Sequence, residues 1–207
     1  MKTTRLEGVR YWGEYQPDRH IDFNGFHWQS PAGGVLIDPM PLDEAQLEEL
    51  RSLGGAAWIV VTNREHLRAA PQLREALGAR VLAPAEERER LGDDACHIDG
   101  WFSSTADLPP ELGACLQVVP LHGGKSPMEP ALYLAPLQAL YFADLVRSHA
   151  SGTLRLLPDE KIRDRAAVLT SLREVADLPV EAVLLGDGDG LYRGADEALR
   201  ELLAVAP

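Results

Sequence analysis

The chain is short of cysteine and of positive charge. Its 2 cysteines, Cys96 and Cys115, lie far apart and form no CxxC pattern. No disulfide framework is therefore indicated, and we expect reduced thiols in a cytoplasmic protein, although the sequence leaves a single disulfide open. Lys and Arg number 20 against 32 Asp and Glu, a net charge of −12. Because a field of that sign repels phosphate backbones, general nucleic-acid binding is not expected.

Long apolar segments are also absent. No apolar run approaches the roughly 20 residues that a membrane span needs. The N-terminal residues are charged and lack the apolar core of a signal peptide. With 45% hydrophobic and 25% charged residues, the composition is ordinary for a globular protein. No linker divides the 207 residues, so we expect a single domain over residues 1–207.

Apolar, β-branched runs alternate with amphipathic segments along the chain. The first sixty residues indicate short strands. The alternation predicts strands at residues 35–37, 58–62, 80–83, 116–120, 131–135, 139–143 and 182–185. It predicts helices at about residues 44–53, 65–77, 85–91, 159–175 and 195–203. Strands with interleaved helices are typical of mixed sheets covered by helices.

Two glycine-rich segments suggest ligand loops but fail on spacing. The run Gly123-Gly124-Lys125-Ser126 has Val119 where a P-loop needs its first glycine, and Pro127 opposes a following helix. The run Gly186-Asp187-Gly188-Asp189-Gly190 lacks the third acid, the glycine and the closing Glu of a calcium loop. We interpret the second run as a sharp turn between a strand and a helix.

Five segments taken in order carry a resemblance to a known family. They are Val35 to Pro39, Val60 to Thr62, Leu121 to Pro127, Tyr141 to Asp144 and Leu185 to Gly188. In this order the chain resembles the metallo-β-lactamase fold, the superfamily of glyoxalase-II-like hydrolases. The resemblance implies an α/β fold: an αββα sandwich of two mixed β-sheets with outer helices. It also implies that the site lies where these segments end.

The resemblance does not extend to the metal ligands. Of the usual ligand positions, only Asp144 keeps its residue type, as the Asp that bridges two metals in the family. The other ligand positions hold Asn63, Glu65, Leu67, Arg68, Lys125 and Asp187. Protonated lysine and arginine cannot bind zinc, and no imidazole or thiolate stands at a ligand position. We therefore expect a divergent member with a degenerate metal motif, no metal ligands and no cofactor.

The substituted residues suggest that cations stand in place of the metals. Lys125 and Arg68 would face Glu65, Asp144 and Asp187 across a polar cleft. At ~4 Å such an ion pair contributes a few kcal/mol at an effective dielectric near 20. Lys125 and Asp144 should then lie within about 12 Å of each other, the reach of two long side chains. Lys125 can equally be a plain internal partner of Asp144.

Our first hypothesis is a hydrolase relative that binds or acts on a small anionic metabolite at a degenerate, metal-free site. Two sets of residues are the candidates. The catalytic set is Glu65, His66, Lys125, Asp144 and Asp187, and the substrate-binding set is Asn63, Arg68, His122 and Lys125. His66 and His122 can also be ordinary polar residues near loops.

Two alternatives stay open at this point. In one, Glu65, Asp144 and Asp187 form a remodelled carboxylate site of a true metallohydrolase, which suits Mg or Mn better than Zn. In the other, the protein is a non-catalytic binding or assembly protein. The sequence leaves open the substrate, the reaction, catalysis itself and whether the chain forms a homo-oligomer.

Overall fold

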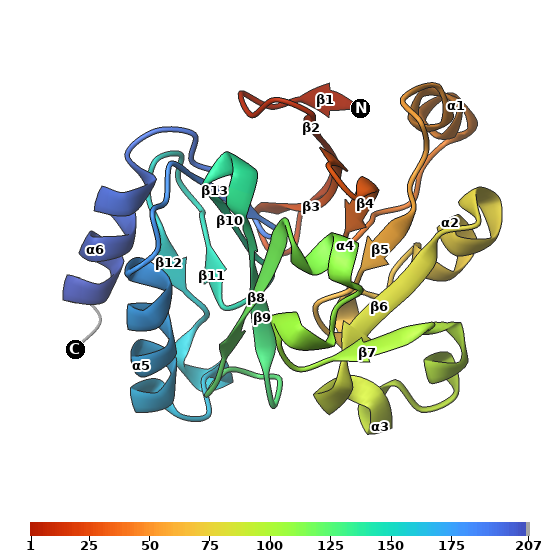
Figure 1. The fold of residues 1–207 in the computed structure, drawn as a ribbon. Helices are drawn as coiled ribbons and strands as arrows, with labels where there is room; N and C mark the ends of the chain where they lie inside the picture. The colour runs from red at the N-terminus through yellow and green to blue at the C-terminus, as the bar shows by residue number, and fades with distance from the viewer. Residues whose placement is uncertain (206–207) are drawn as a thin grey trace.

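Two β-sheets pack face to face in the computed structural model, which describes residues 1–205, and helices cover both outer sides (Figure 1). The larger sheet has the strand order β1-β2-β3-β4-β5-β6-β7, and the smaller has β13-β10-β9-β8. Each is mixed: pairing turns from antiparallel to parallel at β4 in the first sheet and at β10 in the second. The predicted αββα sandwich is confirmed.

The strands have the following bounds. The larger sheet contains β1 (Lys2–Thr3), β2 (Val9–Gln16), β3 (Ile21–Ser30), β4 (Gly33–Ile37), β5 (Trp58–Val60), β6 (Arg80–Pro84) and β7 (Gly100–Phe102). The smaller contains β8 (Leu116–Leu121), β9 (Glu129–Leu134), β10 (Ala139–Phe142) and β13 (Ala182–Leu185). A separate pair consists of β11 (Val146–Arg147) and β12 (Arg155–Leu156).

The helices lie on the outer faces of the sandwich. They are α1 (Glu44–Ser52), α2 (Ala70–Leu77), α3 (Arg88–Leu91), α4 (Pro110–Gly113), α5 (Arg165–Ala176) and α6 (Ala195–Val205). Short 3-10 helices span Arg64–His66, Ala85–Glu87, Gly92–His97, Thr105–Asp107, Ala135–Leu137 and Asp159–Lys161. In Figure 1, α5 and α6 flank the smaller sheet on the left, and α1 and α2 flank the larger on the right. Within residues 1–205, none of these helices has the length and apolarity to cross a membrane.

The core follows from the alternation of side chains along each strand. In β5, Trp58 and Val60 point into the layer between the sheets, whereas Ile59 packs on the outer face beneath α1 and α2. In β10, Tyr141 points inward and Leu140 packs outward against α5 and α6. Fully burying one such aliphatic side chain contributes about 1.5–3 kcal/mol. The sheets thus hold the loops at their edge on a rigid base.

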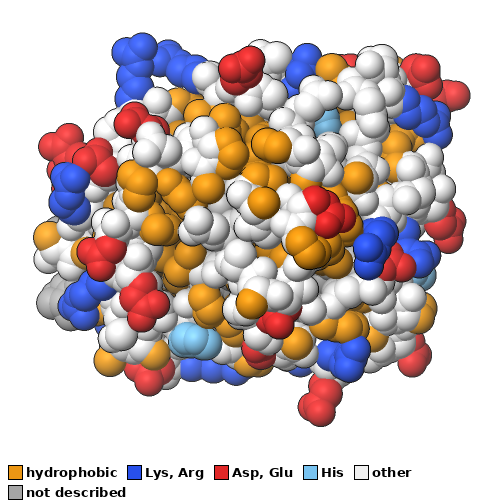
Figure 2. Space-filling view, in the orientation of Figure 1, with side chains coloured by type: hydrophobic (Ala, Val, Ile, Leu, Met, Phe, Trp, Pro, Cys, Tyr) orange, Lys and Arg blue, Asp and Glu red, His pale blue; other side chains and the backbone are white. Residues whose placement is uncertain are grey.

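Hydrophobic and charged side chains occupy different parts of the face shown in Figure 2. Hydrophobic atoms gather near its middle, and Lys, Arg, Asp and Glu lie mostly towards its margin. Among the described residues, Tyr15 is the one large hydrophobic residue that is largely exposed, at 54%. Both cysteines are free, as expected.

Four sequence expectations need correction. Of the early strands, β2 and β3 are not short, because they form a hairpin of eight paired positions. The helix expected at residues 65–77 is broken at Arg68, whose φ of +37° leaves the helical region, so α2 begins later. The helix expected at 85–91 divides into a 3-10 turn and α3. The helix expected from residue 159 begins later, as α5 at Arg165. The Asp164 side chain caps its start by accepting a hydrogen bond from Ala167 N.

Candidate functional site

The candidate site forms where four strands end. Asp38, Thr62, Asp144 and Asp187 follow the last residues of β4, β5, β10 and β13 by one or two positions. Because β4 and β5 are parallel, as are β10 and β13, their carboxyl ends lie at the same edge of each sheet. The side chains that these loops carry meet between the two sheets, as the following contacts show.

Asp38 is the central acceptor of the site. It is fully buried and has a φ of +45°, a backbone conformation that asparagine and aspartate tolerate better than most residues. Its Oδ1 accepts from Thr62 N (2.8 Å), and its Oδ2 accepts from Thr62 Oγ1, Tyr141 Oη and His66 Nδ1 (each 2.6 Å). Burial alone would raise the pKa of Asp38, but His66, Arg68 and Thr62 hold this pKa below its ordinary value. Asp38 is therefore a carboxylate.

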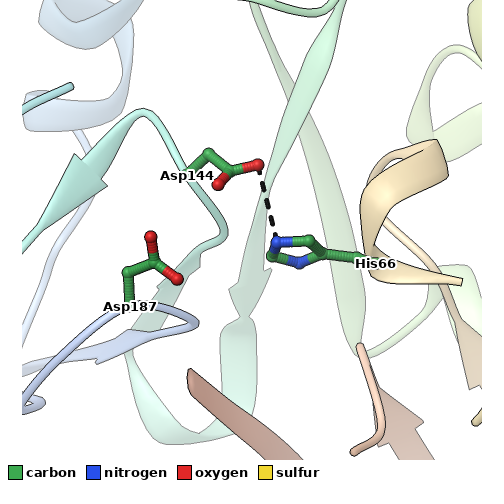
Figure 3. Close-up of side chains that lie close together, drawn as sticks. All are labelled: His66, Asp144 and Asp187. Carbon is green, nitrogen blue, oxygen red and sulfur yellow. Dashed lines mark ion pairs between the residues drawn. The ribbon is translucent and has the colours of Figure 1, made fainter. Parts of the chain in front are cut away.

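His66 connects Asp38 to Asp144. Its 3-10 helix is capped by the Asn63 side chain, which accepts from Glu65 N at 2.9 Å. His66 Nε2 lies 3.5 Å from Asp144 Oδ2, and Figure 3 shows the ring pointing at that carboxylate. Burial lowers the pKa of His66, but the two aspartates outweigh it and raise the pKa to about 9. The two flanking carboxylates thus favour the protonated form of the ring.

Arg68 lies on the other side of the His66 ring. Its Nη2 is 3.2 Å from His66 Nε2. With a protonated ring this is a contact between two donors, so we assign the Nε2 proton to Asp144. Arg68 is held instead by two backbone acceptors through Nη1, Asn24 O (3.0 Å) and Asp38 O (3.2 Å). Through these two bonds Arg68 supports the Asp38 loop.

Lys125 and Asp144 form the ion pair that the sequence predicts. Lys125 Nζ lies 2.7 Å from Asp144 Oδ2 and also bonds the Glu65 carboxylate. Asn63 Nδ2 donates to the same Asp144 oxygen at 2.9 Å. Burial would raise the pKa of Asp144, but His66 and Lys125 hold it well below its ordinary range. The expectation that Lys125 and Asp144 lie within reach of each other is confirmed.

Asp187 is covered by a guanidinium. Arg147 Nη2 lies 2.8 Å from Asp187 Oδ2 and 3.8 Å from Asp144 Oδ1. Burial raises the pKa of Asp187, and the charge of Arg147 opposes the shift without cancelling it. Asp187 is 1% exposed, so it lies beneath the site rather than on its surface. The sequence reasoning missed Arg147.

Glu129, at the start of β9, is a second buried acid that the sequence reasoning missed. It accepts hydrogen bonds from Asp144 N (3.0 Å) and Leu145 N (2.8 Å) and so fixes the turn that presents Asp144. Burial, followed by the charge of Asp144, raises its pKa to about 7. The available signal was a lone acid at the head of an otherwise apolar strand.

A cleft of about 410 Å³ opens above these pairs. Of the residues expected at the site, Glu65, Lys125 and Asp144 line it. Five cations take part in its wall, against three acids; they are Arg19, Lys125, Arg147, Lys161 and Arg163. Arg19, Lys161 and Arg163 make no ion pair within residues 1–205. His122 lies outside the cleft wall; it is exposed, and its backbone N–H donates to Ser171 Oγ.

The donor atoms present do not suit the dinuclear zinc centre of the family. His66, Asp144 and Asp187 each offer one ligand atom, and these atoms lie within 4.8 Å of one another. The two acids already have cationic partners in the chain, Lys125 for Asp144 and Arg147 for Asp187, whereas Asp38 bonds His66 Nδ1 and leaves Nε2 facing Asp144. Glu65, the third acid of the expected carboxylate trio, is not in this group; its carboxylate bonds Lys125, which also bonds Asp144. The arrangement is a chain of alternating charges.

Comparison with known proteins places this geometry in a family. A profile of the metallo-beta-lactamase superfamily matches residues 1–206. A metallo-beta-lactamase from Pontibacter korlensis has a TM-score of 0.72 and 16% identity, with 98% of each chain covered. FIM-1 from Pseudomonas aeruginosa, in a mono-zinc form, has a TM-score of 0.70 and 18% identity, covering 100% of this chain and 95% of its own. A metallo-beta-lactamase from Hirschia baltica has a TM-score of 0.69 and 14% identity, covering 97% of this chain and 96% of its own.

No curated protein matches the chain. At the identities of these solved structures, the likeness is one of fold. The match of the family profile over the whole described chain is the finding that bears on membership.

Proposed function

Because this chain belongs to the metallo-β-lactamase superfamily, we propose that it is a divergent member of this hydrolase family that binds a small anionic metabolite without a metal. The observation that carries the proposal is the pairing of Lys125 Nζ with Asp144 Oδ2 at 2.7 Å. An ammonium so close to a carboxylate takes the place that a cationic metal would need. Lys125 and Arg147 then neutralise the buried acids, and Lys125 together with the cations at the opening of the cleft faces the ligand.

The unpaired cations support an anionic ligand. Arg19, Lys161 and Arg163 stand around a cleft of about 410 Å³ and have no acidic partner within residues 1–205. The net charge of the chain is −12, so the opening of the cleft, with three cations that lack an acidic partner among the described residues, is locally positive on a negatively charged protein. Arginine in particular binds carboxylates and phosphates through two parallel hydrogen bonds. A carboxylate or phosphate of metabolite size fits a cleft of this volume.

The remaining candidates then divide by position. We propose that Lys125 contacts the ligand, since its side chain is 20% exposed and lines the cleft. Asn63 orients Asp144, and His66 and Asp187 are held in buried pairs beneath it. Glu65 is the half-exposed carboxylate beside the cleft and the acid best placed to exchange a proton with a bound molecule.

A metallohydrolase is the second candidate, favoured by one observation. The ligand atoms of His66, Asp144 and Asp187 lie within 4.8 Å of one another. One His nitrogen with carboxylate oxygens suits Mn or Mg as well as Zn. A metal here would have to displace Lys125 and Arg147 and take the proton from His66.

Calorimetric titration tests the proposal. The probes are a series of small dicarboxylates and organic phosphates, each titrated with and without EDTA. We expect binding that EDTA leaves unchanged and that falls at least tenfold in Lys161→Gln/Arg163→Gln. Arg173→Gln, an exposed arginine on α5, is the matched control and should bind normally. Binding that requires an added divalent metal would favour the second candidate, and no binding of any probe would contradict the proposal.

A further inference from the structure

A second cavity, of about 330 Å³, lies between the β2–β3 hairpin and the segment that follows β13. It shares no lining residue with the cation-lined cleft. The segment Gly186–Gly190 separates the two: Asp187 pairs with Arg147 of the cleft, whereas Gly188 and Asp189 line the second cavity. This cavity can therefore hold a ligand of its own.

Its wall presents a side-chain acceptor, on a buried residue, that makes no hydrogen bond within the described residues. Asn24 is 5% exposed, and its Nδ2 donates to Leu185 O (3.0 Å) and Gly188 O (2.8 Å), which fixes the orientation of the amide. Its Oδ1 makes no hydrogen bond within residues 1–205. That oxygen lies 2.5 Å from the position that a Cβ on Gly13 would occupy, and Gly13 also lines the cavity. Glycine at position 13 thus lets the amide oxygen lie close against the β2 backbone, at the wall of the cavity.

Two carboxylates and two phenol rings complete the wall. Asp22 and Asp189 line the cavity and make no ion pair within the described residues. Tyr11 and Tyr192 supply ring faces, and Lys2 Nζ already lies 5.5 Å from the centroid of the Tyr11 ring. Burial, followed by the nearness of Tyr11 and Asp189, raises the pKa of Tyr192 to about 12, so its phenol stays neutral. Hydrogen-bond acceptors and ring faces therefore dominate this wall.

We propose that this cavity binds a small organic amine, a primary ammonium on a short aromatic or apolar body. The ammonium has three N–H donors, which match Asn24 Oδ1 and the carboxylates of Asp22 and Asp189. The body packs on the rings of Tyr11 and Tyr192, where cations are also attracted to the ring faces. A cavity of this volume is at the lower end for small-molecule sites. The proposal does not depend on what the other cleft binds.

The test uses phenethylammonium as the probe, titrated calorimetrically into the full chain at low salt. We expect one-to-one binding that weakens about three- to tenfold in Asp189→Asn and further in Asp22→Asn/Asp189→Asn. The matched control is Glu174→Gln/Asp177→Asn, which removes the same charge from exposed positions at the end of α5 and should leave the affinity unchanged. Circular dichroism checks that each variant is folded.

Phenethyl alcohol, the neutral counterpart of the probe, should bind at least tenfold more weakly. Equal binding of amine and alcohol would overturn the proposal, because the acceptors would then contribute nothing. An affinity that the Asp22 and Asp189 variants leave unchanged would place the amine elsewhere and overturn it as well. The same holds if the wild-type chain does not bind the probe.

Discussion

The floor and the rim of the cleft differ in how their cations are used. On the floor, Lys125 and Arg147 lie against buried carboxylates. On the rim, Arg19, Lys161 and Arg163 have no acidic partner within residues 1–205. A buried charge left without its partner costs several kcal/mol, whereas a charge in water costs little. Substitutions on the floor should therefore change stability, whereas substitutions on the rim should change binding and leave stability nearly unchanged.

The largest effect is expected for Asp38→Asn. The substitution keeps the shape of the side chain but removes the charge facing the His66 imidazolium and disturbs four hydrogen bonds. Because His66 is buried, we expect a loss of about 3–5 kcal/mol of unfolding free energy. Urea unfolding measures it, with exposed Asp177→Asn as the control. A loss below about 1 kcal/mol would mean that the floor is not an ion-pair network.

The pH dependence of stability should reveal His66. Its folded pKa of about 9 exceeds the unfolded value of 6.5, so the folded state binds the proton more tightly. This protonation stabilises the folded state by up to about 3 kcal/mol. The stabilisation is fully present below the unfolded pKa and is lost as the pH rises through about 9. Unfolding free energies between about pH 6 and pH 10 should fall accordingly, and His66→Gln should reduce the slope. An unchanged slope in the variant would argue for a neutral ring.

Lys125→Met tests the ion pair nearest the cleft. The variant keeps the apolar stem but leaves Asp144 without its ammonium. Lys125 is 20% exposed, and Asp144 keeps Asn63 and His66 as partners. We therefore expect the unfolding free energy to fall by about 1–3 kcal/mol, less than for a fully buried pair. Affinity for the anion should fall as well. If neither unfolding free energy nor binding changes, Lys125 has neither role.

The smallest change in stability is expected at the rim. Arg163→Gln should alter the unfolding free energy by less than about 0.5 kcal/mol, because the side chain has no acidic partner to lose within residues 1–205. It should nevertheless weaken anion binding several-fold. A variant that loses stability but not binding would reverse the distinction between rim and floor.

The sequence predicted the fold because the strand signals are local. The runs around Val35, Val60, Tyr141 and Leu184 are apolar and β-branched or aromatic, and each ends at a polar residue that the sheets bring to one edge. Their order resembles that of the superfamily, and the profile match confirms the resemblance. The pairing of Lys125 with Asp144 was predictable from the same alignment.

Other parts of the site could not be predicted because they depend on contacts distant in sequence. The positive φ of Arg68 interrupts a segment whose periodicity favours one continuous helix. Glu129 accepts a hydrogen bond from the backbone of Asp144, and Arg147 pairs with Asp187. No local sequence pattern encodes either contact. Arg19 reaches the cleft from the β2–β3 hairpin, whose length the sequence analysis missed.

Metal analysis tests the central claim most directly, that cations of the chain take the place of the metals. The protein, purified without chelator, is dialysed against dilute zinc at neutral pH, and its metal content is measured by mass spectrometry. The pairing of Lys125 with Asp144 and of Arg147 with Asp187 predicts well below one zinc per chain. Two tightly held zinc ions per chain would contradict the account.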